Sequence, residues 1–423
     1  MKRRDFLAMA SVASAAGAVM WLPAAFVAGQ GAARVDEPAS GVSSGTPDVP
    51  GYRNLLILVE LKGGNDGLNT VIPYADPTYY RLRKNIGIKR EQLIQLDGRA
   101  ALHPALQPLM PLWHARELAI VQGVGYAQPN LSHFRSIEIW DTASRADQYL
   151  REGWLSRAFA QRPVPAGFAA GGMVIGSAEM GPLANGADTI ALMDPVRFAR
   201  ASRLVAPGSL HERNVELHHV HGVAGDIVKA APFARPATGA HDGQPALNTA
   251  FPPGAFGASI RTAMQALSEG DNLQGLPLAG EGVAAVRLTL NGFDTHQNQP
   301  GQHAALLAQL AEGLMSMKAA LVEMGRWDRT LVMTYSEFGR TPRENLGHGT
   351  DHGTVAPHFV AGGRVRGGLH GVPPVLTRLD GNGNLPVGVD FREMYATVLA
   401  SWWGLDPAIV LRDRFAPLPL LRV

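Results

Sequence analysis

Runs of apolar residues recur along the chain and predict the strands of one sheet. The runs are nearly continuous and lie at residues 55–61, 119–124, 283–290, 330–335 and 359–361. Continuous hydrophobicity, in place of alternation with polar residues, is typical of strands that are buried on both faces, as in parallel sheets. The pattern therefore predicts a mainly parallel sheet with helices on both sides.

Two segments have apolar residues at helical spacing instead. Residues 303–324 lie between two of the apolar runs and predict a long helix, and residues 391–403 predict another. A strand, a long helix and a second strand form a βαβ unit. Residues 162–250 are rich in Gly, Pro and Ala and predict an irregular inserted cap. We expect a single α/β domain over residues 51–423.

The N-terminus has the features of an export signal. Arg3-Arg4-Asp5-Phe6-Leu7 is a twin-arginine motif, and an Ala-rich, mildly apolar run follows it to about Ala28. We predict a signal peptide and the start of a linker over residues 1–33, with Ala33 fitting the small-residue cleavage rule loosely, and linker over 34–50. An uncleaved anchor is the alternative, but this composition makes a poor membrane span. The expected location is periplasmic or secreted, with the Tat translocase as a partner during export.

Composition excludes several classes of protein. The 423 residues are 46% hydrophobic and 17% charged, which is enough for a large buried core. The net charge is +2 without a block of like charges, so no nucleic-acid partner is expected. The chain has no cysteine, which excludes thiolate metal sites, a cysteine nucleophile and disulfides.

Carboxylates and imidazoles follow several of the predicted strands. Loops at the carboxyl ends of strands are where open α/β sheets place their sites, and carboxylate plus imidazole suits Zn²⁺- or Mn²⁺-type ions. Each such residue has a plainer alternative, either a turn residue or a surface ion pair. The candidate metal ligands are Asp66, Asp294, His296, Glu337, Asp351 and His352.

Three further residues are candidates for catalysis. Ser132 precedes a helical pattern, so it is either a helix cap or a nucleophile favoured by the helix dipole. Arg135 follows one turn later and either holds an anionic ester oxygen or lies on a solvated helix face. Arg340 follows the strand at 330–335 and could hold an oxyanion. A separate cluster, His218, His219 and His221, is interpreted as surface.

Several of these segments together resemble the DUF1501 family of exported bacterial proteins. The matching segments are Leu61–Asn69, Ser132-His133-Phe134, Gly292–Gln299, Ser336–Thr341 and Gly349–Gly353 with Phe359–Gly363. That family is in turn similar to the alkaline phosphatase superfamily, which includes sulfatases and cofactor-independent phosphoglycerate mutases. The resemblance implies an alkaline-phosphatase-like α/β fold.

The resemblance also implies roles for individual residues. Asp66 would bind one metal, Ser132 would be the nucleophile, and Asp294 and His296 would bind the other metal. Glu337-Phe338-Gly339 would occupy the place of an Asp-His-Gly motif, in which Phe338 cannot bind a metal. His352, preceded by Asp351, would be the final histidine. The alternative alignment equates Asp351-His352-Gly353 with Asp-His-Gly directly.

The leading hypothesis is an exported, metal-dependent hydrolase of phosphate or sulfate esters with a serine nucleophile. It would hold one or two divalent ions of the Zn, Mn or Ca class and act on a small-molecule or glycan anionic ester. The second hypothesis is a binding protein on a hydrolase scaffold that has lost its activity, because fold does not imply function. The third is a secretion-linked structural protein in which the metal only stabilises the fold.

Overall fold

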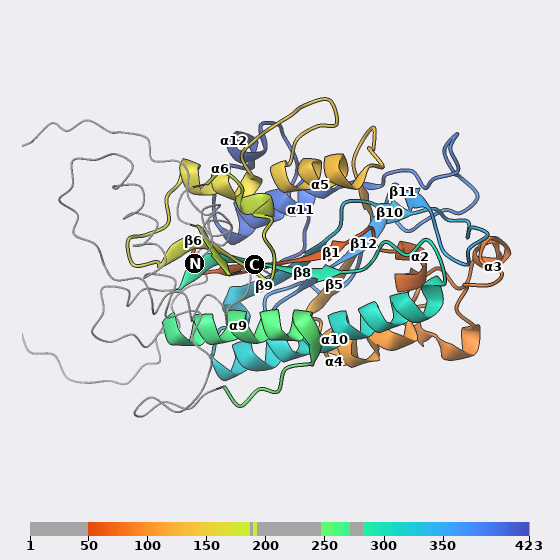
Figure 1. The fold of residues 1–423 in the computed structure, drawn as a ribbon, viewed down its shortest axis with the longest axis horizontal. Helices are drawn as coiled ribbons and strands as arrows, with labels where there is room; N and C mark the ends of the chain where they lie inside the picture. The colour runs from red at the N-terminus through yellow and green to blue at the C-terminus, as the bar shows by residue number, and fades with distance from the viewer. Residues whose placement is uncertain (1–49, 187–188, 193–246, 271–281, 423) are drawn as a thin grey trace, which may run out of the picture.

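The structure of the protein, a computed structural model, describes residues 50–186, 189–192, 247–270 and 282–422 (Figure 1). The predicted signal and almost all of the predicted linker lie outside the described residues. So do His218, His219 and His221.

A nine-stranded sheet with β1 (Leu55–Lys62) near its centre forms the core of the fold. The strand order is β13-β5-β12-β9-β1-β8-β6-β7, and β14 also pairs with β5. Every pairing in this sheet is parallel except those of β12, so the predicted mainly parallel sheet is confirmed. The remaining strands are β5 (Leu118–Gly125), β6 (Ala170–Ile175), β7 (Thr189–Leu192), β8 (Val283–Asn291), β9 (Thr330–Tyr335), β12 (Ala356–Ala361), β13 (Gly368–Gly371) and β14 (Val389–Asp390).

Helices cover both faces of this sheet (Figure 1). One face carries α4 (Met110–His114), α9 (Gly254–Gly270) and α10 (Gln299–Glu323). The other carries α5 (His133–Thr142), α6 (Trp154–Gln161), α11 (Phe391–Ala396) and α12 (Pro407–Leu411). Because both faces are covered, seven of the eight residues of β1 are buried, which explains the continuous apolar run.

Smaller elements complete the described chain. The short helices are α2 (Gly67–Thr70), α3 (Pro77–Leu82), η2 (Arg90–Gln92), η3 (Pro104–Leu109), η4 (Gly181–Leu183), η6 (Trp327–Arg329) and the π-helix η7 (Thr397–Trp402). The short strands are β2 (Val71–Ile72), β3 (Ile94–Gln95), β4 (Ala101–Leu102), β10 (Gly339–Arg340) and β11 (His352–Gly353). The helix expected over residues 391–403 is thus α11 continued by η7.

Helix α10 is a core helix that begins four residues earlier than its apolar pattern predicts. Its first turn is polar and contains Pro300, which the first turn of a helix tolerates. Leu307, Leu310 and Leu314 are buried against the sheet. In the described part of the chain it is also the one helix long and apolar enough to span a membrane, with a mean hydropathy of 1.3 over the relevant window. Because 56% of that window is buried within the molecule, packing explains its apolar character.

Part of the expected irregular insertion belongs to the main sheet. Strands β6 and β7 extend it beside β8. The glycines that made this segment look irregular allow close packing, because a Cβ on Gly172 would lie 2.5 Å from a methyl carbon of Leu183. Residues 193–246 of the expected insertion lie outside the described residues.

The sheet brings three loops to one edge. Strands β8 and β9 flank β1 and run parallel to it, with Lys62 opposite Asn291 and Glu60 opposite Tyr335. The loops that follow these strands therefore begin side by side at their carboxyl ends, as expected for an α/β sheet.

Candidate metal centre

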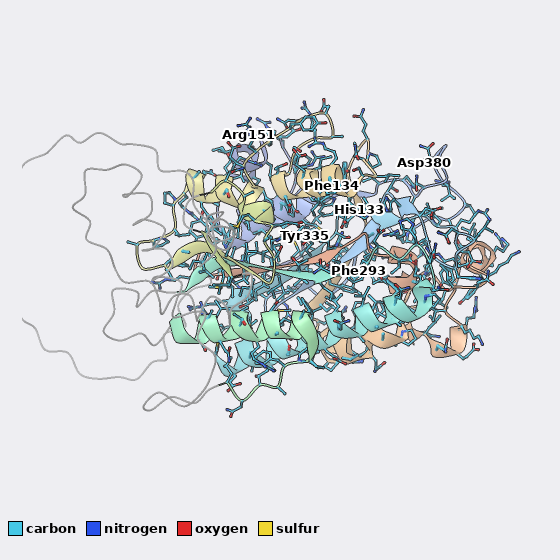
Figure 2. All side chains as sticks on the ribbon, viewed as in Figure 1. His133, Phe134, Arg151, Phe293, Tyr335 and Asp380 are labelled. Carbon is cyan, nitrogen blue, oxygen red and sulfur yellow. The ribbon has the colours of Figure 1, made fainter. Side chains whose placement is uncertain are left out.

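Three histidines and one aspartate, carried by α5, β11 and the loop after β8, converge at this edge of the sheet. Oδ1 of Asp294 lies 3.0 Å from Nε2 of His296 and 3.3 Å from Nε2 of His352. The two Nε2 atoms are themselves 3.0 Å apart. His133, the first residue of α5 (Figure 2), places its Nε2 3.4 Å from Oδ2 of Asp294. We refer to His133, Asp294, His296 and His352 as the histidine–aspartate cluster.

The other nitrogen of each imidazole faces an acceptor. Nδ1 of His352 lies 2.7 Å from the carbonyl oxygen of Leu131, and Nδ1 of His133 lies 2.8 Å from Oε1 of Glu337. Carbonyl and carboxylate oxygens only accept hydrogen bonds, so both Nδ1 atoms donate.

Nδ1 of His296 lies 3.5 Å from Oδ1 of Asp351, a looser contact of the same kind. With Nδ1 turned to an acceptor, each ring turns its Nε2 toward Asp294. Metal-bound histidines in proteins have this arrangement, with an oxygen acceptor behind the ligating ring.

Charges around the cluster keep its aspartate ionised. Burial would raise the pKa of Asp294, but the hydrogen bond and charge of Arg340 outweigh it and lower that pKa. Burial lowers the pKa of His352, whereas the hydrogen bond with Glu337 raises the pKa of His133. A metal ion requires an ionised carboxylate and neutral imidazoles, so it would have to compete with a proton at His133. The donor set of nitrogen and oxygen atoms fits a Zn²⁺- or Mn²⁺-type ion better than Ca²⁺, which prefers oxygen ligands alone.

Arg340 lies beneath the cluster and binds the backbone of the surrounding loops. It is buried and donates hydrogen bonds to the carbonyl oxygens of Gly64 (2.8 Å), Phe293 (3.1 Å) and Thr350 (3.1 Å). It also donates to Oδ1 of Asp294 at 2.6 Å. The residue considered as an oxyanion holder is thus positioned to orient Asp294.

Glu337 lies behind His133 and does not face the other donors of the cluster. Both of its carboxylate oxygens accept from the amide of Gly63, at 2.9 and 3.1 Å. Gly63 has φ +119°, and a Cβ there would lie 2.3 Å from the amide nitrogen of Asp294. Only glycine lets the loop after β1 come this close to the loop after β8.

Ser132 occupies the N-cap position of α5, next to His133. Its side chain forms no capping hydrogen bond and is exposed. Its amide donates to Oδ1 of Asn130 at 2.9 Å, which fixes the backbone before the helix. Ser132 is therefore accessible to solvent at the start of α5.

Arg135 points elsewhere. It is buried, donates to the carbonyl oxygens of Arg145, Ala146 and Gln148, and stacks on Tyr149 with its guanidinium carbon 3.9 Å from the ring centre. These contacts fix the chain after α5, and the structure does not bring this residue to the cluster.

Asp66 is buried in an ion pair instead of facing the cluster. Its Oδ2 accepts from Nη1 of Arg83 and from Nε2 of Gln299, both at 2.5 Å. Burial would raise the pKa of Asp66, but the charge of Arg83 outweighs it and lowers that pKa. Among the described residues Oδ1 of Asp66 has no hydrogen-bond partner.

Phe338 forms an aromatic wall beside the cluster. Its buried ring centre lies 4.8 Å from that of His133 and 4.4 Å from that of His352. The ring fixes the planes of both imidazoles by packing and contributes no ligand atom.

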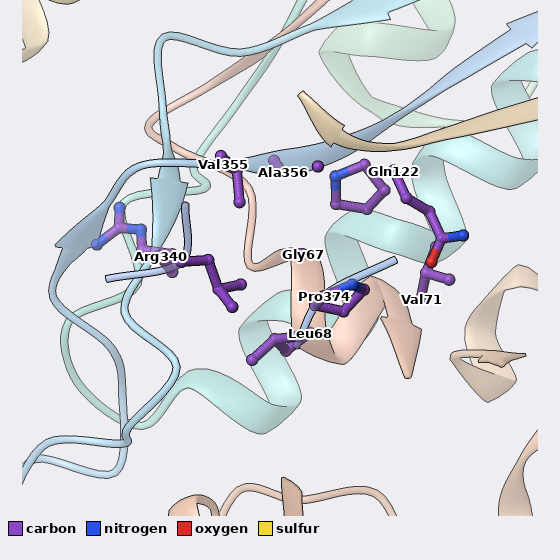
Figure 3. Close-up of a pocket in the computed structure, with 11 residues that line it drawn as sticks. Gly67, Leu68, Val71, Gln122, Arg340, Val355, Ala356 and Pro374 are labelled. Carbon is purple, nitrogen blue, oxygen red and sulfur yellow. The ribbon is translucent and has the colours of Figure 1, made fainter. Parts of the chain in front are cut away.

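A small cavity near Arg340 is distinct from the cluster (Figure 3). Its volume of about 20 Å³ has room for about one water molecule. The lining is mostly apolar and contains none of the four donors: Gly67, Leu68, Val71, Gln122, Gly123, Arg340, Val355, Ala356, Pro357, Pro374 and Leu385.

Sequence reasoning did not identify His133 as a candidate ligand, although it noted the segment Ser132-His133-Phe134. A histidine directly after a predicted N-cap was the available signal. Gln299 and Arg83 were also missed, because neither follows a predicted strand directly.

Comparison with known proteins agrees with the family expected from the sequence. A family model described as "Protein of unknown function (DUF1501)" matches residues 53–415. The chain belongs to this family. Among curated proteins none matches.

Solved structures of similar shape include a phosphonate monoester hydrolase from Silicibacter pomeroyi, with a TM-score of 0.39, 12% identity and coverage of 86% of this chain and 75% of that one. A protein in the alkaline phosphatase superfamily from Vibrio parahaemolyticus has a TM-score of 0.37 and 12% identity, covering 87% and 72%. The PsFucS1 sulfatase from Pseudoalteromonas sp. has a TM-score of 0.36 and 10% identity, covering 86% and 70%.

Proposed function

We propose that this DUF1501 protein is an exported, metal-dependent hydrolase of phosphate or sulfate esters. The observation that carries the proposal is the convergence of three imidazole Nε2 atoms on Asp294, with an oxygen acceptor behind each ring. His133, Asp294, His296 and His352 would bind one divalent ion, of the Zn or Mn class by the choice of donors.

The proposed reaction uses Ser132 as the nucleophile. When bound, a divalent ion supplies positive charge to an ester oxygen and lowers the pKa of a nearby hydroxyl. Oγ of Ser132 would give up its proton to solvent and form a bond to the phosphorus or sulfur atom, while the bond to the leaving oxygen breaks and that oxygen takes a proton from solvent. Water would then cleave the serine ester and restore the hydroxyl of Ser132. The start of α5 supports this role, because its free N–H groups favour negative charge on the transferred group.

Asp66, Glu337 and Asp351 support the ligands in this proposal. Glu337 accepts a hydrogen bond from Nδ1 of His133, and Asp351 lies beside Nδ1 of His296. Arg340 holds Asp294. One ion, with Phe338 beside it, is the stoichiometry that this arrangement favours.

The substrate class and the location are further parts of this proposal. A small-molecule or glycan anionic ester would reach the partly exposed cluster from solvent. The motif Arg3-Arg4 supports export through the Tat translocase to the periplasm or beyond.

One observation favours a second function, that of a binding protein without turnover. Arg135 is turned away from the cluster, and Arg340 is engaged with backbone carbonyls and Asp294. Neither of these guanidinium groups is free to hold the non-bridging oxygens of an ester, which hydrolysis of such esters commonly uses.

Metal analysis combined with turnover separates these functions. The purified mature protein, washed with mild chelator, should retain about one transition-metal ion per chain and hydrolyse aryl phosphate or sulfate esters. Ser132→Ala should keep the metal and lose turnover by a factor of roughly 100 or more. Metal without turnover in the wild-type protein would favour the binding function, and unchanged turnover in Ser132→Ala would remove this serine from the mechanism.

A further inference from the structure

A buried network next to the histidine–aspartate cluster connects the loops that carry its ligands. It consists of Asp66, Arg83, Thr295, Gln299 and Thr350, all of them buried. We propose that this group, the Asp66 network, positions Asp294, His296 and His352 for metal binding, with Asp66 as its central acceptor and not as a ligand. The inference rests on the metal site of the proposed function.

Gln299 joins two ligand loops to Asp66. Its Nε2 donates to Oδ2 of Asp66 at 2.5 Å. Its Oε1 accepts from Oγ1 of Thr350 at 2.7 Å and from Oγ1 of Thr295 at 3.1 Å. Because a single amide group has both roles, the orientation of its acceptor depends on the carboxylate of Asp66.

The two threonines whose hydroxyls bind Gln299 lie within two residues of proposed ligands along the chain. Thr295 stands between Asp294 and His296, and Thr350 precedes His352 by two residues. The two loops also bond directly, from the amide of Thr350 to the carbonyl oxygen of Thr295 at 3.3 Å. A shift of Gln299 would therefore move three of the four proposed ligands together.

Arg83 extends the network to the turn after Arg340. Its Nε donates to the carbonyl oxygen of Pro342 at 2.9 Å, and its Nη2 to that of Thr341 at 3.0 Å. Nη1 bonds to both Asp66 and Asn69. The charge that neutralises Asp66 thus also fixes the chain that follows β10.

The burial of these groups makes the network stiff. Side chains of Asp66 and Arg83 are 0% exposed, and hydrogen bonds in such a low-dielectric interior are stronger than in water. Groups that orient metal ligands through hydrogen bonds commonly change metal affinity about 10- to 100-fold when they are removed. We expect the same range for this network, although it acts through the backbone of the ligand loops.

Thr350→Val is the cleanest test, because valine keeps the shape of threonine, removes the hydroxyl and cannot bind a metal in its place. In the mature protein, we expect the affinity for Co²⁺, measured by competition with a chelator, to fall about 10- to 100-fold. The visible absorption of the bound Co²⁺ should also change, because the ligand geometry shifts. Thr350→Ser keeps the hydroxyl and should leave both the affinity and the absorption close to those of the wild type.

Thr397→Val is a matched control. Its buried hydroxyl donates to the carbonyl oxygen of Glu393 and accepts from the amide of Leu418, so its removal also costs stability. It should lower the melting temperature without changing Co²⁺ affinity or absorption. If Thr350→Val only lowers the melting temperature in the same way, the positioning role is wrong.

Asp66→Asn separates positioning from ligation. Positioning predicts the same number of bound Co²⁺ ions as in the wild type, at lower affinity. Loss of one whole ion from a protein that binds two would make Asp66 a ligand through its unpartnered Oδ1 and overturn the inference. Absence of Co²⁺ binding by the wild-type protein would overturn both the inference and the metal site, whereas Co²⁺ binding without turnover would reject the hydrolase alone.

Discussion

The histidine–aspartate cluster and the Asp66 network use similar residue types at the same edge of the sheet, but their environments differ. Asp294 has a side chain that is 47% exposed and one oxygen directed at His133. Asp66 is fully buried, and its Oδ2 accepts from two protein donors. A carboxylate at a strand end is therefore not a metal ligand by residue type alone. What separates these two carboxylates is whether solvent reaches them and which partners surround them.

The histidines show the same contrast. In the cluster each Nδ1 faces an acceptor, and the Nε2 atoms converge. His303, next to the Asp66 network, instead directs its Nε2 at Oδ1 of Asn65. Burial lowers the pKa of His303 to about 4, so its ring is neutral near pH 7. The ring is buried, and its Nε2 is not free to bind an ion from solvent.

The largest predicted effect comes from removing ligands of the cluster. Asp294→Ala and His352→Ala should each abolish stoichiometric metal binding and reduce ester hydrolysis by roughly 1,000-fold or more, because the ion and the oriented hydroxyl act together. Elemental analysis and steady-state kinetics on the same samples would measure both. Full metal content in Asp294→Ala would show that Asp294 is not a ligand, and the contrast between Asp294 and Asp66 would then be wrong.

A smaller effect is expected from the acceptors behind the rings. Glu337→Gln removes the charge at 2.8 Å from Nδ1 of His133 and should weaken metal affinity about 10- to 100-fold. Asp351→Asn is the matched variant and should have less effect, because its carboxylate is exposed and 3.5 Å from His296. Chelator competition measures both affinities. A larger loss in Asp351→Asn than in Glu337→Gln would contradict the roles of these two carboxylates.

Acid should destabilise the fold through its buried histidines. Burial lowers the pKa values of His103 and His303 to about 4 and that of His358 to about 3. Between about pH 6.5 and pH 4 the unfolded chain takes up protons that the folded chain does not, so stability falls as the pH falls. The shift corresponds to on the order of 3 kcal/mol per histidine by pH 4.

His358→Leu tests this pH dependence. Among the described residues neither ring nitrogen of His358 has a hydrogen-bond partner, so leucine loses no bond. From pH 7 to pH 4 the melting temperature should fall less steeply in this variant than in the wild type. In the exposed control His114→Leu it should fall as steeply as in the wild type. Equal slopes in wild type and His358→Leu would show that this histidine does not contribute.

The smallest effect is predicted at the rim of the cluster. Phe134 follows His133 and is 89% exposed, and Leu346 lies fully exposed in the loop that Asn345 ties to the carbonyl oxygen of His296. Phe134→Ala and Leu346→Ala should each raise KM for an aryl ester roughly threefold without changing the melting temperature. Ile409→Ala, which removes another exposed side chain on α12, should change neither.

The main strands of the sheet could be predicted from the sequence alone. Strands β1, β5, β8 and β9 are buried on both faces, so their apolar runs identified them without knowledge of their partners. It also placed Asp294, His296 and His352 at strand ends or in Gly-rich loops. Strand β6 was not predicted, because the glycines that pack against Phe159 and Leu183 reduce its hydrophobic signal, and β7 is only four residues long.

The role of each polar residue depends on contacts that form when the chain folds. Asp66 meets Arg83 seventeen residues later and Gln299 from another helix, and no local pattern encodes such contacts. His133 joins the cluster because α5 begins over the edge where β8 and β9 end. Hydrophobic burial is repeated in every turn or strand and can be read locally, whereas the role of a charged group depends on the few partners that the fold places within hydrogen-bonding distance.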